Sequence, residues 1–166
     1  MSTPPLDPPL DPPLDPPLDP PLDPTPVSQA LRETAGALRA ATESVVRPLG
    51  LSLAQYSCLA VLHREPGASG ADVARATHVT RQSVHVLLRS MELEGLVERG
   101  RSVGRALSWR PTPLGRQRLR EAEAEVRRLD AAVLRSLDGT QRRTLRGLLE
   151  ACAESLDGAT PSGGPS

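Results

Sequence analysis

Polar side chains cluster between residues 80 and 89, and their types suit contacts with DNA. A guanidinium can pair with guanine through two hydrogen bonds, and a carboxamide can do the same with adenine. We expect contacts with base edges from Arg81, Gln82, Ser83 and His85, and contacts with phosphate from Thr80 or Arg89. The alternative is a packed pair of helices whose polar face meets only solvent.

Two helices are expected to position this cluster. Ser69, with an acid three residues later, has the local chemistry of a helix start, and this first helix ends near Thr77-His78. Thr80 is the expected N-cap of a longer helix, Arg81 to Glu94, followed by Gly95. One apolar stripe at helical spacing follows that helix: Val84, Leu87, Leu88 and Met91. The tight connection predicts a helix-turn-helix, whose second helix would enter a DNA groove.

A small hairpin is predicted after this unit, from strands at 96–101 and 105–110. Alternation places Leu107 and Trp109 on one face of the second strand and Ser108 with Arg110 on the other. Two arginines flank the tip of the hairpin, Arg101 and Arg105. They would insert into a narrow minor groove or contact backbone phosphate only, and the sequence leaves both possibilities open.

The charge distribution supports a nucleic-acid partner. The chain has 20 basic and 20 acidic residues, and every basic residue is arginine. Between Arg75 and Arg120, however, ten arginines face only three glutamates, a local net charge of +7. Concentrated positive charge favours phosphate binding. An arginine-rich, solvated helix surface is the alternative explanation.

Further helices complete a mainly α (α+β) fold with a small β-hairpin wing. The apolar spacing predicts helices over 28–47, from Ser52 to about Arg64, from Pro113-Leu114 to about Leu137, and over 141–156. The stripes of the first and the last two helices exceed what one small lobe can cover. We therefore expect them to form a helical dimerisation region in a homodimer.

Several other functions find no support in the sequence. Cys58 and Cys152 indicate a reducing compartment without a disulfide framework. The three histidines lack metal-ligand spacing, and no catalytic constellation is found, so we expect neither enzyme activity nor a metal or cofactor. No segment predicts a membrane span or a leader peptide, and we expect a cytoplasmic protein that does not contact the membrane.

Composition divides the chain into three parts. Residues 1–26 contain Pro-Pro-Leu-Asp repeated five times and predict an extended, disordered leader. A docking segment for a proline-binding partner and an acidic arm that competes with DNA are the alternatives for this leader. Residues 27–157 form the expected domain, with dimerisation helices at 27–50 and 113–157 around a DNA-binding lobe at 51–112. Residues 158–166 predict a flexible tail.

Three local motifs, in order, resemble the MarR family of winged helix-turn-helix regulators. Leu51-Ser52-Leu53-Ala54-Gln55-Tyr56 is similar to the family's entry to its second helix. Met91-Glu92-Leu93-Glu94-Gly95-Leu96-Val97-Glu98-Arg99 resembles the exit from its recognition helix. Arg110-Pro111-Thr112-Pro113-Leu114-Gly115-Arg116 resembles the entry to its dimer helix. The resemblance as a whole, including the order of the predicted helices, covers roughly residues 27–156.

The resemblance also implies an effector and shows two departures. It implies a phenolic or aromatic-acid ligand in a cleft near Tyr56 and His63, which are seven residues apart; core packing of Tyr56 is the favoured alternative. The family's Asp-Arg-Arg in the wing is here Val103-Gly104-Arg105. Its acid late in the recognition helix, usually paired with a wing arginine, is here Arg89.

We therefore expect a dimeric, sequence-specific DNA-binding regulator, with ligand-responsive repression at a pseudo-palindromic operator. A winged-helix module that binds protein and a non-specific architectural DNA binder are the alternatives. Steep salt dependence on duplex DNA would exclude the first, and a footprint confined to one palindromic site would exclude the second.

Overall fold

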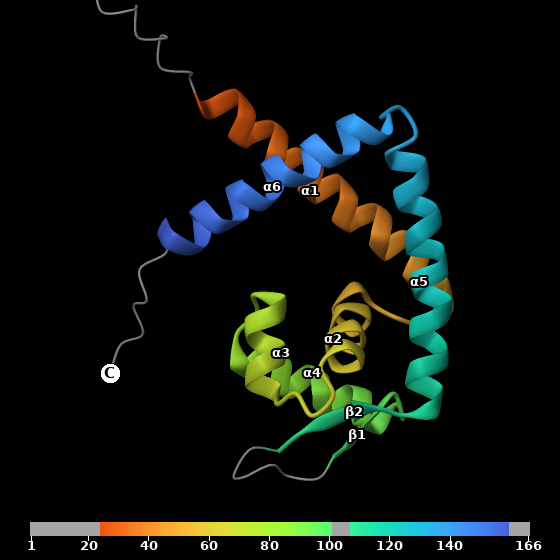
Figure 1. Cartoon of the computed structure of the whole chain (residues 1–166). Coiled ribbons are helices and arrows are strands. Elements are labelled where there is room, and N and C mark those ends of the chain that lie inside the picture. The colour runs from red at the N-terminus through yellow and green to blue at the C-terminus, as the bar shows by residue number, and fades with distance from the viewer. Residues whose placement is uncertain (1–23, 101–106, 160–166) are drawn as a thin grey trace, which may run out of the picture. The chain divides into compact units, whose positions relative to one another are not determined.

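The computed structural model describes residues 24–100 and 107–159, with side chains described over 27–100 and 107–156. The chain divides into two compact units, Met1–Ala35 and Gly36–Ser166. In the first unit, the described part is the beginning of helix α1 (Pro24–Val46), where Val27 and Leu31 are exposed. All other described elements belong to the second unit (Figure 1).

Helix α1 begins four residues before the predicted start at Ser28, within the segment expected to be extended. Proline is tolerated in a first helical turn because the N–H it lacks would have no intrahelical partner there. Pro24 and Pro26 can therefore belong to the helix. The short 3-10 helix η1 (Arg47–Leu49) follows, and Gly50 closes it at a φ of 74°.

Side-chain caps start the next three helices as predicted. Ser52 and Gln55 form a capping box at the start of α2, and Ser69 with Asp72 forms a second at the start of α3. Thr80 caps α4 by accepting a hydrogen bond from the Ser83 N–H. The bounds are Leu53–Arg64 for α2, Gly70–Thr77 for α3 and Arg81–Leu93 for α4. The tight connection between α3 and α4 confirms the helix-turn-helix.

Strands β1 (Val97–Arg99) and β2 (Trp109–Pro111) form an antiparallel hairpin. Burial does not alternate along the second strand as the predicted facing would suggest, because Ser108 is 5% exposed and Leu107 is 38% exposed. The reason is a third segment: Ser108 bridges Ser69, and the Trp109 N–H donates to the Ala68 carbonyl at 3.1 Å. This pairing buries both faces around 108–109, so simple alternation fails.

Two longer helices complete the second unit, α5 (Pro113–Val133) and α6 (Gly139–Ala159). Helix α5 ends four residues before the predicted Leu137. Helix α6 begins two residues before the predicted Gln141, because the Asp138 carboxylate accepts hydrogen bonds from the backbone N–H groups of Thr140 and Gln141. This aspartate satisfies donors that otherwise have no partner in a first turn.

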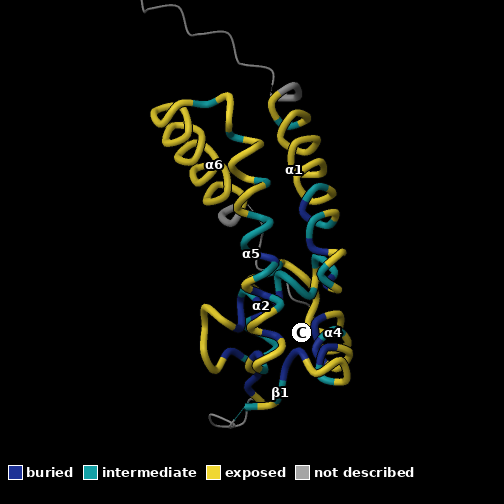
Figure 2. The backbone as a smooth tube through the Cα atoms, turned by 90° about the vertical axis from the view of Figure 1, so that its right-hand side faces the viewer, coloured by how far each residue is buried: buried dark blue, intermediate teal, exposed yellow. Residues whose placement is uncertain are grey.

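The core lies among α2, α3, α4, the hairpin and the start of α5. Its largest fully buried side chains are Leu59, Leu62, Leu88, Met91 and Leu119. Every described side chain of α6, in contrast, is exposed (Figure 2). No single described helix is long and apolar enough to cross a membrane. Helices α1 and α2 together would be long and apolar enough, but they are bent relative to each other, and α2 buries Cys58, Leu59, Val61 and Leu62 in this core.

Candidate nucleic-acid interface

The buried stripe of α4 determines which of its side chains face outward. Val84, Leu88 and Met91 are buried at 1% exposure or less. At about 100° per residue, Gln82, Val86 and Arg89 then lie about 130–170° around the helix axis from the centre of that stripe. These three positions form the outward ridge of α4, and all three are exposed.

The structure separates the predicted contact residues into two groups. Arg81, Gln82 and His85 are exposed, and none has a hydrogen-bond or ion-pair partner among the described residues. The hydroxyls of Thr80 and Ser83 lie 2.9 Å apart at the helix N-terminus, where Thr80 also serves as the cap. Arg81, Gln82 and His85 are therefore the side chains available for an external partner.

Val86 is a residue of this surface that sequence reasoning missed. It is 64% exposed at the middle of the outward ridge, one turn after Gln82. Its type drew attention away from it, because polar residues are the expected base readers. A projection of the predicted helix opposite its apolar stripe would have found it.

Arg101 and Arg105 lie outside the described residues. In the described part of the hairpin, the Arg99 guanidinium contacts Glu92 of α4, with Nε 2.9 Å from Oε1 and Nη2 3.3 Å from Oε2. The same guanidinium lies 5.7 Å from the centre of the Trp109 ring. Nη1 of Arg89 also lies 4.0 Å from Oε2 of Glu92. Glu92 therefore ties the strand β1 to the end of α4.

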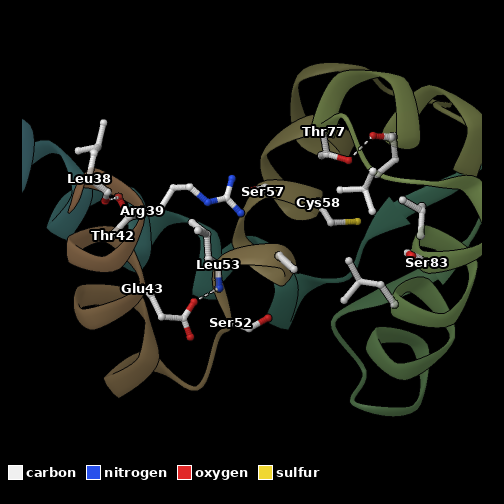
Figure 3. Close-up of a pocket in the computed structure, with 15 residues that line it drawn as sticks. Leu38, Arg39, Thr42, Glu43, Ser52, Leu53, Ser57, Cys58, Thr77 and Ser83 are labelled. Carbon is white, nitrogen blue, oxygen red and sulfur yellow. Dashed lines mark hydrogen bonds between the residues drawn. The ribbon is translucent and has the colours of Figure 1, made fainter. Parts of the chain in front are cut away.

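A cavity of about 600 Å³ lies behind α4, lined by residues from α1, α2, the end of α3 and the first half of α4 (Figure 3). Ser83, Val84 and Leu87 contribute the α4 wall. Most of the lining is apolar, and Cys58 forms part of it. Burial raises the pKa of the Cys58 thiol to about 12, so this wall stays uncharged.

One side of the cavity carries charged groups from α1. The Glu43 carboxylate accepts a hydrogen bond of 2.6 Å from the Leu53 N–H, at the first residue of α2, and also contacts Arg47. The Arg39 side chain extends toward α2 (Figure 3), and no described residue forms an ion pair or hydrogen bond with it. The Arg39 guanidinium is therefore a cation at the edge of an apolar cavity, without a described partner.

Neither predicted ligand residue lines this cavity. Tyr56 is half-buried against the core, and burial raises the pKa of its phenol, with smaller contributions from Glu123 and Asp130. His63 is exposed near the end of α2. The cavity uses the other face of α2, with Leu53, Ser57 and Cys58, which carry no signal in the sequence beyond ordinary helical spacing.

Comparisons with known proteins identify the family of this chain. Residues 49–106 match the sequence model of the MarR family. The HTH-type transcriptional repressor Rv2887 of Mycobacterium tuberculosis is 39% identical over 127 residues, which cover 75% of this chain and 91% of the repressor. The chain belongs to the MarR family. It is a helix-turn-helix transcriptional regulator, and the family is not enzymatic.

Two crystal structures of this MarR-family relative align over most of both chains. In the complex with DNA, the relative's chain is 35% identical to this one, with a TM-score of 0.64, and the alignment covers 76% of this chain and 97% of that one. Its complex with salicylic acid is 37% identical, has a TM-score of 0.63, and covers 76% and 96%. The winged-helix fold predicted from the sequence is confirmed.

Near Arg89, where the MarR-family pattern has an acid, the structure pairs another acid of α4 with the wing. An acid–arginine pair between the recognition helix and the wing is present, but it uses Glu92 and Arg99. Glu92 lies three residues after Arg89, nearly one turn along the same helix.

Proposed function

We propose that this MarR-family chain is a dimeric, cytoplasmic transcriptional repressor that reads a pseudo-palindromic operator with helix α4. The observation that carries the proposal is the exposed surface of α4, where the side chains of Arg81, Gln82 and His85 have no described protein partner. Their donors and acceptors suit base edges and phosphates in a major groove. The relative Rv2887, a repressor by name and crystallised with DNA, supports the same role.

Exposed apolar side chains support a homodimer. Helix α6 exposes Leu145, Leu148, Leu149 and Leu156, and Val133 at the end of α5 is 54% exposed. Apolar residues repeated along an exposed helix face indicate burial against a partner. A two-fold dimer would place two α4 helices about one DNA turn apart, so we expect half-sites spaced by roughly 10 bp.

A binding titration against duplex DNA tests this proposal. The probe is a fluorescent duplex selected by the full chain from a random-sequence pool, and anisotropy gives its affinity at several salt concentrations. Arg81→Ala should weaken binding and reduce discrimination between the selected duplex and an unrelated one. Arg135→Ala removes the same charge from an exposed turn after α5 and should leave affinity and discrimination unchanged.

Each alternative function has its own outcome in this experiment. Phosphate contacts are strongest at low salt. If the chain retains no duplex under that condition, the proposal is refuted in favour of a protein-binding module. Equal affinity for every duplex would instead identify a non-specific DNA binder. A footprint confined to one palindromic site supports the proposal.

We also propose that a small aromatic acid regulates DNA binding from the cavity behind α4. Its carboxylate would pair with Arg39 and its ring would occupy the apolar lining, with the hydroxyls of Thr42 and Ser57 close by. The cavity volume of about 600 Å³ falls within the usual range for small-molecule sites. The relative Rv2887 crystallises with salicylic acid, which has this chemistry. Because α4 supplies one wall, an occupied cavity would favour one position of that helix over another.

Titration calorimetry with salicylate tests the effector proposal and separates it from a site at Tyr56 and His63. Arg39→Ala should abolish measurable binding and the loss of DNA affinity that salicylate causes. Tyr56→Phe and His63→Ala should bind salicylate as the wild type does. If these two variants lose binding while Arg39→Ala retains it, the site lies on the other face of α2.

A further inference from the structure

We propose that Val86 is a specificity-determining residue that reads the C5-methyl group of one thymine in each half-site. This inference rests on the proposed DNA-binding function and adds a base preference to it. Its starting point is an apolar, β-branched side chain at the middle of the outward ridge of α4, 64% exposed between Gln82 and Arg89.

Val86 has no structural role that accounts for its type. It does not belong to the buried core or to the partly buried side chains packed against it. A β-branched residue also has a lower helix propensity than the straight-chain residues that usually fill exposed helix positions. We therefore expect the Val86 side chain to contact an external partner that binds over α4.

The major groove offers one apolar group, the thymine C5-methyl. Cytosine and both purines present polar edges there. Val86 is the sixth residue of α4 and lies in the half of a recognition helix that contacts base edges. The adjacent Gln82 suits adenine, and the positive charge of Arg89 complements the phosphates. An apolar residue in this position favours thymine over the other bases.

The distribution of other exposed apolar side chains on α4 provides a matched control. Leu93 is 90% exposed and lies on the same side of α4 as Val86, two turns later. In a helix-turn-helix, the residues near the start of the recognition helix contact the bases. Leu93 at the end of α4 should therefore not contact a base, although it is apolar and exposed as Val86 is.

Deoxyuridine substitution tests the proposal because it removes only the methyl group. The full chain selects a duplex from a random-sequence pool, and each thymine of that duplex is then replaced by deoxyuridine in both half-sites. At one thymine position, the wild type should lose about fourfold in affinity per half-site, the effect of one buried methyl group. Val86→Ala should bind the thymine duplex more weakly by a similar factor and should not distinguish thymine from deoxyuridine there.

The outcomes separate this inference from the function on which it rests. Leu93→Ala should retain the full wild-type sensitivity to deoxyuridine at every position. The inference is overturned if the wild type binds the selected duplex but no position loses its deoxyuridine sensitivity in Val86→Ala. It is also overturned if Leu93→Ala abolishes the same sensitivity. Failure of the wild type to select any duplex would instead refute the DNA-binding proposal itself.

Discussion

Replacing Gly115 with alanine should destabilise the protein by about 2–3 kcal/mol, because α5 packs directly against the backbone that follows α4. A Cβ at position 115 would lie 2.0 Å from the Leu96 carbonyl oxygen and 3.2 Å from Cδ2 of Leu59. Ordinary contact begins at 3.4 Å, so the carbonyl would have to move by about 1.4 Å. That carbonyl also accepts the Thr112 N–H at 3.0 Å.

The size of the effect follows from three contributions. Overpacking of this kind costs about 1–3 kcal/mol, and weakening the hydrogen bond from Thr112 costs about 1 kcal/mol. Alanine returns up to about 1 kcal/mol through its higher helix propensity. The free energy lost through overpacking and the weakened hydrogen bond should therefore exceed the gain in helix propensity.

Urea denaturation followed by circular dichroism measures this difference, with Gly147→Ala as the matched control. Gly147 also lies inside a helix, but a Cβ at position 147 would meet no described atom within 4 Å, so alanine should leave the stability unchanged or raise it by up to about 1 kcal/mol. Equal midpoints for the two variants would refute the close packing of α5 on Leu96.

Three further predictions concern single side chains. Arg99→Ala should lower the free energy of unfolding by about 1–2 kcal/mol, because it removes both the pair with Glu92 and the contact with the Trp109 ring; an unchanged urea midpoint would contradict this. Hydrogen bonds from Ser69 lower the pKa of Asp72 below its ordinary 3.8, so its stabilisation is present above that pH and is lost as pH falls through the folded-state value. Asp72→Asn should therefore flatten the acid limb of a stability-against-pH curve, and an identical limb would count against the capping box. In Cys152→Ser, Ellman's reagent at pH 8 should find no reactive thiol until urea unfolds the chain, because burial raises the pKa of Cys58 to about 12; rapid reaction of the folded protein would contradict its burial.

Local chemistry made much of this fold predictable from sequence. A cap requires only a hydroxyl and an acid or amide three residues apart, so Ser52 with Gln55 and Ser69 with Asp72 could be identified without tertiary information. The buried stripe of α4 follows in the same way from helical spacing.

Tertiary contacts explain what the sequence could not predict. The burial of Ser108 depends on a bridge to Ser69, almost 40 residues away, which has no local signal. The cavity beside Arg39 depends on how α1, α2 and α4 meet, whereas the family resemblance implied a cleft near Tyr56 and His63. Val86 was missed for a different reason, because residue type was weighed above helical position.

Sedimentation velocity of the full chain, alone and with its selected duplex at about 50 mM salt, decides whether a dimer binds DNA. We expect a dimer in the absence of DNA and a complex of two chains per duplex in its presence. A chain that sediments as a monomer and leaves the duplex unbound would contradict the proposed dimeric regulator.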